Sequence, residues 1–194
     1  MVKFIILIAF AYVIGSLSSA IIVCKLLGLP DPRTTGSNNP GATNVLRIGG
    51  KIPALITLVG DIFKGVIPVL LAKAFGIDGF LLGLIAIAAL AGHIFPVFFG
   101  FKGGKGVATA LGGLLGLSFI VGILAIITWV VVAAIFRYSS LAALAAFVLA
   151  PVYALIFTQA HYVIPIIIIT LIIIWRHFDN IMRLKSGTET KISF

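Results

Sequence analysis

Residues 100–109, GFKGGKGVAT, place two lysines among four glycines. Glycine lets a backbone approach a ligand closely, and a helix that follows such a turn directs its partial positive charge at an anion. We expect Lys105 to begin such a helix and Lys102 to add charge. A turn whose lysines face lipid headgroups is the alternative, and it explains the cations but not the glycines. The stretch therefore predicts a phosphate-binding element.

A nucleotide P-loop does not fit this stretch. That motif requires a glycine five residues before the Gly-Lys pair, where Phe99 stands, and a hydroxyl directly after the lysine, where Gly106 stands. No purine-nucleotide site follows from it.

Another polar stretch, TTGSNNPGATNVLR, covers residues 34–47, and we call it the first polar stretch because it comes first in the chain. Glycine turns with free backbone N–H groups suit anions, and Thr43 or Asn44 could cap a helix start. Arg47 supplies a planar fork that can hold a phosphate through two hydrogen bonds. A flexible connector is the alternative, which the turn at Asn39 and the following Pro-Gly allows. We favour ligand binding.

The third stretch is WRHFDNIMRLKSGTE, residues 175–189. If one helix continues through it, Arg176, Asn180 and Arg183 share a face, with His177 three residues before Asn180. An amphipathic helix end that touches lipid phosphates is equally consistent with these residues. Gly187 is expected to end the helix.

The composition indicates which class of protein carries these polar stretches. Of the 194 residues, 61% are hydrophobic and only 10% are charged, too few for the surface of a water-soluble domain. The formal net charge of +9 is spread between apolar runs rather than gathered in one stripe, so nucleic-acid binding is not expected. The single cysteine, Cys24, excludes an intrachain disulfide and a cysteine metal cluster. The chain is predicted to be an all-α integral membrane protein.

The apolar runs are long enough to span a bilayer of about 30 Å. The run 106–136 is too long for one span, because about 31 residues would reach about 46 Å. Its glycines and Ser118 suggest a break, so we expect one short helix near 106–116 and about seven transmembrane helices in all. The other runs lie near 3–24, 53–75, 79–99, 118–137, 139–159 and 161–178.

Charge asymmetry sets the expected orientation. With seven helices, eleven of the 14 lysines and arginines fall on one face, and only Lys3 and Lys73 fall on the other. The positive-inside rule then places the N-terminus outside and the C-terminus in the cytoplasm. The eleven are Lys25, Arg33, Arg47, Lys51, Lys102, Lys105, Arg137, Arg176, Arg183, Lys185 and Lys191.

The domain organisation is predicted to be a single membrane domain, residues 1–194. Its polar cytoplasmic segments would be 25–52, 100–106 and 176–194. A cleaved secretory signal is the alternative for the first run, but that run continues through IIVC, and Lys25 and Arg33 follow it. We therefore expect the first helix to be retained.

Two opposite charges, Asp61 and Lys64, lie three residues apart near the middle of the second span. A lone charge there costs several kcal/mol, so mutual pairing or contact with the polar site is expected. A structural ion pair is the default, and a proton or ion pathway is the alternative.

Taken together, GSNNPGATNVLR, GHIFPVFFGFKGGKGVATA and WRHFDNIMRLKSGTE resemble the three signature segments of the bacterial acyl-phosphate:glycerol-3-phosphate acyltransferases. Three ordered motifs across the whole chain are far more specific than any one of them. The resemblance implies transfer of a fatty acyl group from acyl phosphate to the 1-hydroxyl of glycerol 3-phosphate. The products would be lysophosphatidic acid and phosphate, in phospholipid biosynthesis.

The resemblance also implies roles for individual residues. The essential serine and arginine of the first segment correspond to Ser37 and Arg47, the glycine-rich glycerol-3-phosphate site corresponds to residues 102–106, and the third segment contributes His177, Asn180 and Glu189. His93 also stands where the second segment has a histidine. We predict catalytic roles for Ser37, Arg47, His177 and Asn180, and support of the site by Glu189, Asp61, Lys64 and His93. The predicted substrate-binding residues are Asn39, Thr43, Asn44, Lys102, Gly103, Gly104, Lys105, Gly106 and Arg183.

The implied reaction needs no cofactor or metal, and its partners are acyl phosphate, glycerol 3-phosphate and the lipid bilayer. No obligatory protein partner is expected. The resemblance implies a multi-pass protein of the bacterial cytoplasmic (inner) membrane whose active site faces the cytoplasm. The competing class is a transporter of phosphate esters or other anions, but the expected outer turns are too short to form a matching polar entrance.

Overall fold

Every regular element of the computed structural model, which describes residues 1–192, is a helix or a 3₁₀ turn. The α-helices are α1 (Val2–Gly15), α2 (Ser19–Leu26), α3 (Ala42–Gly49), α4 (Lys51–Ala74), α5 (Gly79–Ile94), α6 (Val107–Leu117), α7 (Phe119–Phe136), α8 (Ser139–Phe157), α9 (Val163–Arg176) and α10 (Phe178–Lys185). The 3₁₀ turns are η1 (Val97–Phe99) and η2 (Ala160–Tyr162).

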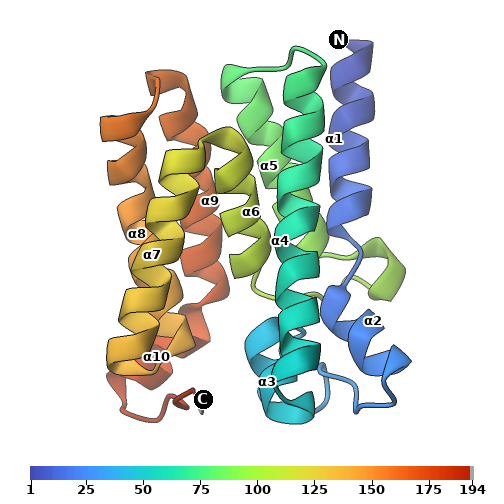
Figure 1. Cartoon of the computed structure of the whole chain (residues 1–194), viewed down its shortest axis with the longest axis vertical. Helices are drawn as coiled ribbons and strands as arrows, with labels where there is room; N and C mark the ends of the chain where they lie inside the picture. Colours follow the sequence, from blue (N-terminus) through green and yellow to red (C-terminus); the bar gives the residue numbers. More distant parts are fainter. Residues whose placement is uncertain (193–194) are drawn as a thin grey trace.

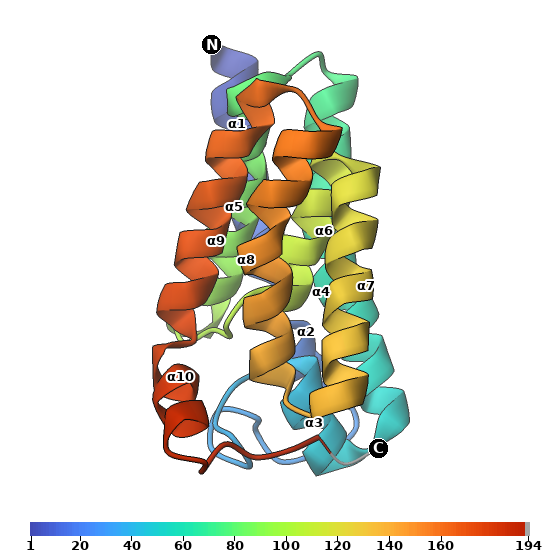
Figure 2. The same ribbon diagram turned by 90° about the vertical axis from the view of Figure 1, so that its left-hand side faces the viewer.

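The long helices stand side by side in one bundle (Figure 1). Helices α1, α4 and α5 form one side of it, α7, α8 and α9 form the other, and the short α6 lies between them, packed on α4, α5 and α7. The start of α1 and helix α10 lie at opposite ends of the bundle. Helices α2 and α3 gather at the same end as α10, which we call the inner end (Figure 2).

The predicted all-α membrane fold is confirmed. Four helices are long and apolar enough to cross a membrane, and the number rises to six if each of two bent pairs is one span. Large aliphatic and aromatic side chains such as Phe119, Ile135 and Leu155 are mostly exposed on the outside of the bundle, as lipid-facing residues are. The number of crossings and the side on which each terminus lies stay predictions.

The expected break within residues 106–136 is present. Helix α6 ends at Leu117, Ser118 adopts an extended conformation, and α7 begins at Phe119. The hydroxyl of Ser118 accepts a hydrogen bond from the Val121 N–H at 3.5 Å, so it caps α7. A hydroxyl at this position satisfies one of the backbone donors that a helix start leaves free.

Two expected straight helices are bent instead. The first run breaks at residues 16–18, where α1 and α2 meet at 41°, and the last run breaks at His177, where α9 and α10 meet at 59°. At the first break the Leu17 carbonyl accepts from Lys64 Nζ at 2.8 Å. The sequence could not show this break, because apolar residues continue across it and the partner lies in another helix.

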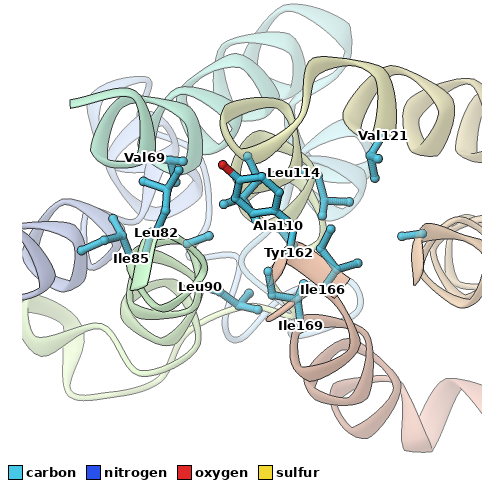
Figure 3. Packing of buried hydrophobic residues seen from close by; sticks show 14 of the residues in the cluster. Val69, Leu82, Ile85, Leu90, Ala110, Leu114, Val121, Tyr162, Ile166 and Ile169 are labelled. Atoms are coloured by element: carbon cyan, nitrogen blue, oxygen red, sulfur yellow. The ribbon is translucent and has the colours of Figure 1, made fainter. Parts of the chain in front are cut away.

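Small residues allow the helices to approach closely. An added Cβ on Gly65 would lie 2.0 Å from the Thr109 carbonyl oxygen, and one on Gly112 would lie 2.2 Å from the Ile62 carbonyl oxygen. Helices α4 and α6 therefore touch through their backbones, as is common in membrane bundles, where packing rather than water exclusion drives association. Around them, aliphatic side chains from α4, α5, α6 and α9 form the core (Figure 3).

Candidate active site

The glycine-rich segment 100–106, which we call the elbow, is held against the end of α5. The Gly103 N–H donates to the Ile94 carbonyl, and the Gly104 N–H donates to the His93 carbonyl, each at 3.2 Å. An added Cβ on Gly103 would lie 2.0 Å from the His93 carbonyl oxygen, and one on Gly104 would lie 2.3 Å from His93 Nε2. Both glycines are thus required by packing on α5.

The structure explains the presence of two of these glycines differently from the sequence. We predicted that they let a ligand approach, whereas Gly103 and Gly104 first let the elbow approach α5. Their part in binding stays a prediction. Gly106 has a φ of +86°, which favours glycine, and it is the N-cap of α6. Lys105 therefore precedes the helix by two residues rather than beginning it, and Lys102 is exposed.

The elbow meets the third polar stretch through Lys105. Its ammonium group donates a short hydrogen bond to Asn180 Oδ1, and Asn180 Nδ2 donates to Glu189 Oε1 at 2.7 Å. Asn180 is 5% exposed although it lies in the first turn of a surface helix. A lysine, an amide and a carboxylate from three separate segments are thus joined in one chain, which we call the Lys105 network.

Glu189 is the hub of the Lys105 network. Besides the bond from Asn180, its carboxylate accepts from the Ser140 hydroxyl at 2.6 Å and from Arg183 Nε at 2.8 Å. Burial raises the pKa of Glu189, but the hydrogen bonds from Ser140, Arg183 and Asn180 outweigh it, so the net pKa lies below the ordinary value. Glu189 is therefore ionised at neutral pH.

Sequence reasoning missed Ser140. It stands in the first turn of α8, where a serine after a turn is typical of an ordinary helix start. Only the fold, which brings the tail after α10 beneath the α7–α8 turn, reveals that it holds Glu189.

His177 occupies the bend between α9 and α10 and is 2% exposed. Its Nδ1 lies 2.8 Å from the Ile173 carbonyl oxygen. A carbonyl oxygen can only accept, so Nδ1 is assigned the proton and Nε2 is left as the acceptor of the neutral ring. The bend at His177 thus fixes the tautomer that a general base would need.

The bend also overturns the predicted shared face of Arg176, Asn180 and Arg183. Arg176 Nη2 donates to the Gly104 carbonyl at 3.3 Å and so holds the elbow, whereas Asn180 and Arg183 both donate to Glu189. The continuous-helix prediction failed because residue 177 leaves the helical path by 59°. The predicted helix end is present: α10 stops at Lys185, Gly187 has a φ of +73°, and the Thr188 N–H bonds back to the Arg183 carbonyl.

The first polar stretch lies against the elbow. An added Cβ on Gly104 would lie 2.8 Å from the Pro40 carbonyl oxygen. Just before each segment, Arg33 Nη1 donates to the Phe99 carbonyl at 3.3 Å. Ser37 stands three residues before Pro40 with an exposed side chain, and Asn39 is half-buried. The two stretches are therefore neighbours although about 60 residues separate them in sequence.

Asn44 gives the first polar stretch its shape. Its Oδ1 accepts the Ser37 N–H at 2.9 Å, and its Nδ2 donates to the carbonyls of Pro32 and Thr35, both at 2.9 Å. The predicted helix cap is wrong: α3 begins at Ala42 with Gly41 as its N-cap, and no side chain caps it. Asn44 instead reaches back from the first turn and fixes the backbone around Ser37.

Two further contacts bring the first stretch toward the tail. The Thr43 hydroxyl lies 3.0 Å from the Ser139 hydroxyl, and Arg47 Nη2 donates to the Thr190 carbonyl at 3.4 Å. Arg47 is otherwise exposed. The three polar stretches thus meet at the inner end of the bundle, with the elbow between the other two.

A second charged cluster, which we call the Lys64 cluster, lies inside the bundle behind the elbow. Lys64 Nζ is 2.8 Å from Asp61 Oδ1 and also donates to the Leu17 carbonyl. His93 Nδ1 lies 3.9 Å from the same Asp61 oxygen and 3.3 Å from the Thr109 hydroxyl. The expected ion pair is present, and His93 joins this cluster to the elbow through its carbonyl.

The electrostatics of the inner end suit an anion. Burial, together with the nearby charge of Arg183, lowers the pKa of Lys105 to about 8. None of the ion pairs among residues 1–192 includes Lys105. Within the same part of the chain, no group of three or more His, Cys, Asp or Glu could hold a metal ion. The site therefore offers an unneutralised lysine, arginines and a helix start.

Comparison with known proteins matches this chain to one family. The family described as glycerol-3-phosphate acyltransferase matches residues 5–187. Curated relatives of that description include one from Coxiella burnetii (strain Dugway 5J108-111), 54% identical over 97% of this chain and 98% of its own. Another, from Methylococcus capsulatus (strain ATCC 33009 / NCIMB 11132 / Bath), is 55% identical over 96% of this chain and 94% of its own.

Two solved structures are also similar. Both are of PlsY (YgiH), an integral membrane glycerol 3-phosphate acyltransferase. Its glycerol 3-phosphate form has a TM-score of 0.93 and 40% identity, covering 98% of this chain and 96% of that chain. Its lysphosphatidic acid form has a TM-score of 0.90 and 39% identity, covering 97% of this chain and 95% of that chain.

Proposed function

The chain belongs to the glycerol-3-phosphate acyltransferase family, and from this premise we propose that it moves a fatty acyl group from acyl phosphate to the 1-hydroxyl of sn-glycerol 3-phosphate. The products would be lysophosphatidic acid and inorganic phosphate. The solved relative in its glycerol 3-phosphate and lysphosphatidic acid forms supports this acceptor and this product. The acyl-phosphate donor rests on the three motifs of the sequence.

The proposed reaction requires the enzyme to bind anions and does not require it to supply a nucleophile. The acceptor oxygen bonds to the acyl carbonyl carbon, the bond from that carbon to the phosphate oxygen breaks, and the hydroxyl proton leaves. Acyl phosphate is already activated, so the protein has to hold two phosphate groups together, stabilise the oxyanion and accept one proton. A Ser37-linked acyl intermediate is therefore not required.

The Lys105 network is the observation that carries the proposal. Its lysine contacts a neutral amide rather than a carboxylate, so the ammonium charge is available to a phosphate. Arg47 and Arg183 stand on the two flanking stretches and can bind further phosphate oxygens. In this proposal Lys102, Thr43 and the elbow residues 103–106 complete the phosphate contacts. The N–H groups of Gly103 and Gly104 are already bonded to carbonyls of α5, so the free backbone donors are those of the first turn of α6, which the elbow directs toward the substrate.

Ser37 and Asn180 are proposed to orient the reacting groups. Asn44 holds the backbone of Ser37 while leaving its hydroxyl exposed, and Asn180 is fixed between Lys105 and Glu189. Groups fixed in this way need little rearrangement when the substrates arrive, which is a condition for efficient positioning. Asn39, two residues after Ser37 and half-buried, is proposed as a further substrate-binding residue of this stretch.

Two groups can take the proton, namely Nε2 of His177 and a phosphate oxygen of the substrate. If His177 is the sole base, H177Q abolishes turnover and leaves glycerol 3-phosphate binding nearly intact. If a phosphate oxygen takes the proton, His177 only positions the substrate, and H177Q retains substantial activity. Single-turnover rates and equilibrium binding of glycerol 3-phosphate by the same variant separate the two roles.

The proposed reaction is tested with purified protein in detergent, acyl phosphate and glycerol 3-phosphate. We expect phosphate release that depends on glycerol 3-phosphate, and a lysophosphatidic acid product seen by mass spectrometry. Uptake of glycerol 3-phosphate into vesicles with no phosphate release would contradict the proposal and favour the transporter alternative. Acyl phosphate alone reveals a Ser37-linked intermediate, if one forms, as a mass increase.

The location of the site follows from the same proposal. We place the inner end on the cytoplasmic side of a bacterial inner membrane, because eleven of the 14 lysines and arginines were assigned to that face. A K185C variant in a C24S background tests this: in right-side-out membrane vesicles it should resist an impermeant thiol reagent, and in inverted vesicles it should react.

A further inference from the structure

The chain segment after α10 crosses the inner end of the bundle (Figure 2). It leaves α10 at Gly187 and reaches the α7–α8 turn at Ile192, which is 4% exposed. There the Ile192 side chain packs with Ala133 and Ala142 in a small apolar cluster separate from the main core. We call residues 187–192 the strap.

Arg137 holds the end of the strap through three hydrogen bonds. The Ile192 N–H donates to the Arg137 carbonyl at 2.6 Å, and Arg137 Nη2 and Nε donate to the Ile192 carbonyl at 3.1 and 3.3 Å. The same residue thus uses its backbone and its side chain on one partner. This contact fixes both the direction and the register of the strap at its far end.

The conformation of Arg137 is unusual for its position. It ends α7 with a φ of +63° and a ψ of +23°, the left-handed region in which helices commonly end on glycine. A non-glycine residue there is strained, because its Cβ approaches the following carbonyl oxygen. Strain of this kind persists where surrounding contacts hold it, and here both guanidinium hydrogen bonds of Arg137 are with the strap.

Glu189 lies between the two ends of the strap. Its carboxylate holds Ser140, Asn180 and Arg183, and through Asn180 it orients Lys105. Thr190 and Lys191 add one contact each, with Arg47 and with the ring of Tyr138. A six-residue strap that is anchored at both ends leaves Glu189 little freedom to move away from Asn180.

We propose that Arg137 and Ile192 are positioning residues of the acyl transfer, which act by anchoring the strap so that Glu189 keeps Asn180 and Lys105 in place. The proposal rests on the proposed function. It assigns no contact with substrate to either residue. It predicts that loosening the anchor weakens catalysis even where the fold is not weakened.

The R137G variant separates positioning from stability. Glycine adopts the left-handed conformation without strain and keeps the backbone bond to Ile192, but it removes both guanidinium bonds. We expect an unchanged or higher unfolding temperature together with a fall of about tenfold in kcat/KM for glycerol 3-phosphate. A merely structural arginine would move activity and stability in the same direction.

A double-mutant cycle tests whether the anchor acts through Glu189. We expect I192S to lower kcat/KM by about tenfold, I192V to restore most of it, and E189Q to lower it by about 100-fold. Because the two residues would act on one element, I192S/E189Q should lie within about twofold of E189Q alone. The matched control is L26S, since Leu26 is an inner-end leucine that is 79% exposed and lies outside the strap.

Two results would overturn the proposal: wild-type activity of R137G, or a double variant whose loss equals the product of the single losses. Either result leaves the proposed function standing. An inactive wild-type protein would contradict the proposed function itself, before any variant is compared. Unfolding temperatures of I192S and L26S in detergent show whether a loss of activity reflects a loss of fold.

Discussion

Two clusters of the described residues combine a lysine with an acid, and they are built in opposite ways. In the Lys64 cluster the ammonium group touches the Asp61 carboxylate at 2.8 Å, and both side chains are almost fully buried. In the Lys105 network the lysine donates to the Asn180 amide, and the amide in turn donates to the Glu189 carboxylate. The amide therefore separates opposite charges that the other cluster joins.

This difference indicates what each lysine is able to do. Lys64 is neutralised by Asp61 and also bonded to the Leu17 carbonyl, which suits a charge that must remain among apolar helices. Lys105 lacks a carboxylate partner among residues 1–192, and its lowered pKa shows that its charge is incompletely stabilised. An anionic substrate can supply the missing charge. The predictions below test this contrast.

The largest effect is expected from N180D, which makes the Lys105 network resemble the Lys64 cluster. The substitution keeps the side-chain shape but places a carboxylate directly on Lys105, so phosphate must compete with an internal ion pair. We expect kcat/KM for glycerol 3-phosphate to fall by at least about 100-fold, mainly through KM, in steady-state assays at pH 7. D179N, on an exposed neighbour, should stay within about twofold. An unchanged KM for N180D would remove Lys105 from phosphate binding.

A smaller loss is expected from G104A, which disturbs the contact between the two clusters. The new methyl group would lie 2.3 Å from His93 Nε2 and 2.8 Å from the Pro40 carbonyl oxygen, so the elbow has to shift. We expect a loss of about 30-fold in kcat/KM, since displacements of this size are costly to positioned groups. G49A is the control, because its methyl group meets the tip of Leu29, which can move. Full activity of G104A would show that elbow position does not matter.

The pH profile should show the titration of Lys105. A lysine is a cation below its pKa, so with a pKa of about 8 the charge that holds phosphate is lost as the pH rises. We expect kcat/KM to fall by about tenfold per pH unit above about pH 8, because this parameter reports the free enzyme. The second ionisation of phosphate, near pH 6, lies below this window. K105R should remove the alkaline fall; a fall that persists in K105R would assign it to another group.

The smallest effect on activity is expected from replacing both residues of the Asp61–Lys64 ion pair. D61N or K64M alone leaves a buried charge without its partner and should destabilise the fold by about 3–5 kcal/mol. D61L/K64M leaves no buried charge unpaired and should destabilise it less than either single substitution, although the Leu17 carbonyl loses its donor. Unfolding in detergent measures this. Below its unfolding temperature the double variant should keep activity within about threefold. A stable but inactive D61L/K64M would favour the proton or ion pathway instead.

Much of the candidate site could be predicted because its residues belong to short sequence motifs. The glycine and lysine spacing of the elbow, and the polar residues of the stretch 34–47, stand out in a chain that is 61% hydrophobic. The contacts between them could not be predicted. Ser140 holds Glu189, and Asn44 holds the backbone of Ser37, through folding that no short pattern specifies.

The errors have a common physical origin. The bends at residues 16–18 and at His177 were missed because periodicity within one helix does not reveal a break stabilised by another element. Lys64 donates a hydrogen bond to the Leu17 carbonyl at the first break. After the second break, Lys105 donates a hydrogen bond to Asn180. Backbone groups in a membrane must be satisfied somewhere, and the partner can come from any helix that packs there.

The sequence by itself determined that this chain is an apolar helical bundle, that α6 is short, and which three stretches carry its polar chemistry, because hydropathy and glycine placement act locally along the chain. The i,i+3 spacing of Asp61 and Lys64 within one helix also predicted that Lys64 is neutralised. Only the tertiary structure decided that Lys105 is left for a ligand. Its surroundings depend on distances of a few ångströms between side chains that are far apart in sequence, and packing sets those distances by placing Asn180 between Lys105 and Glu189.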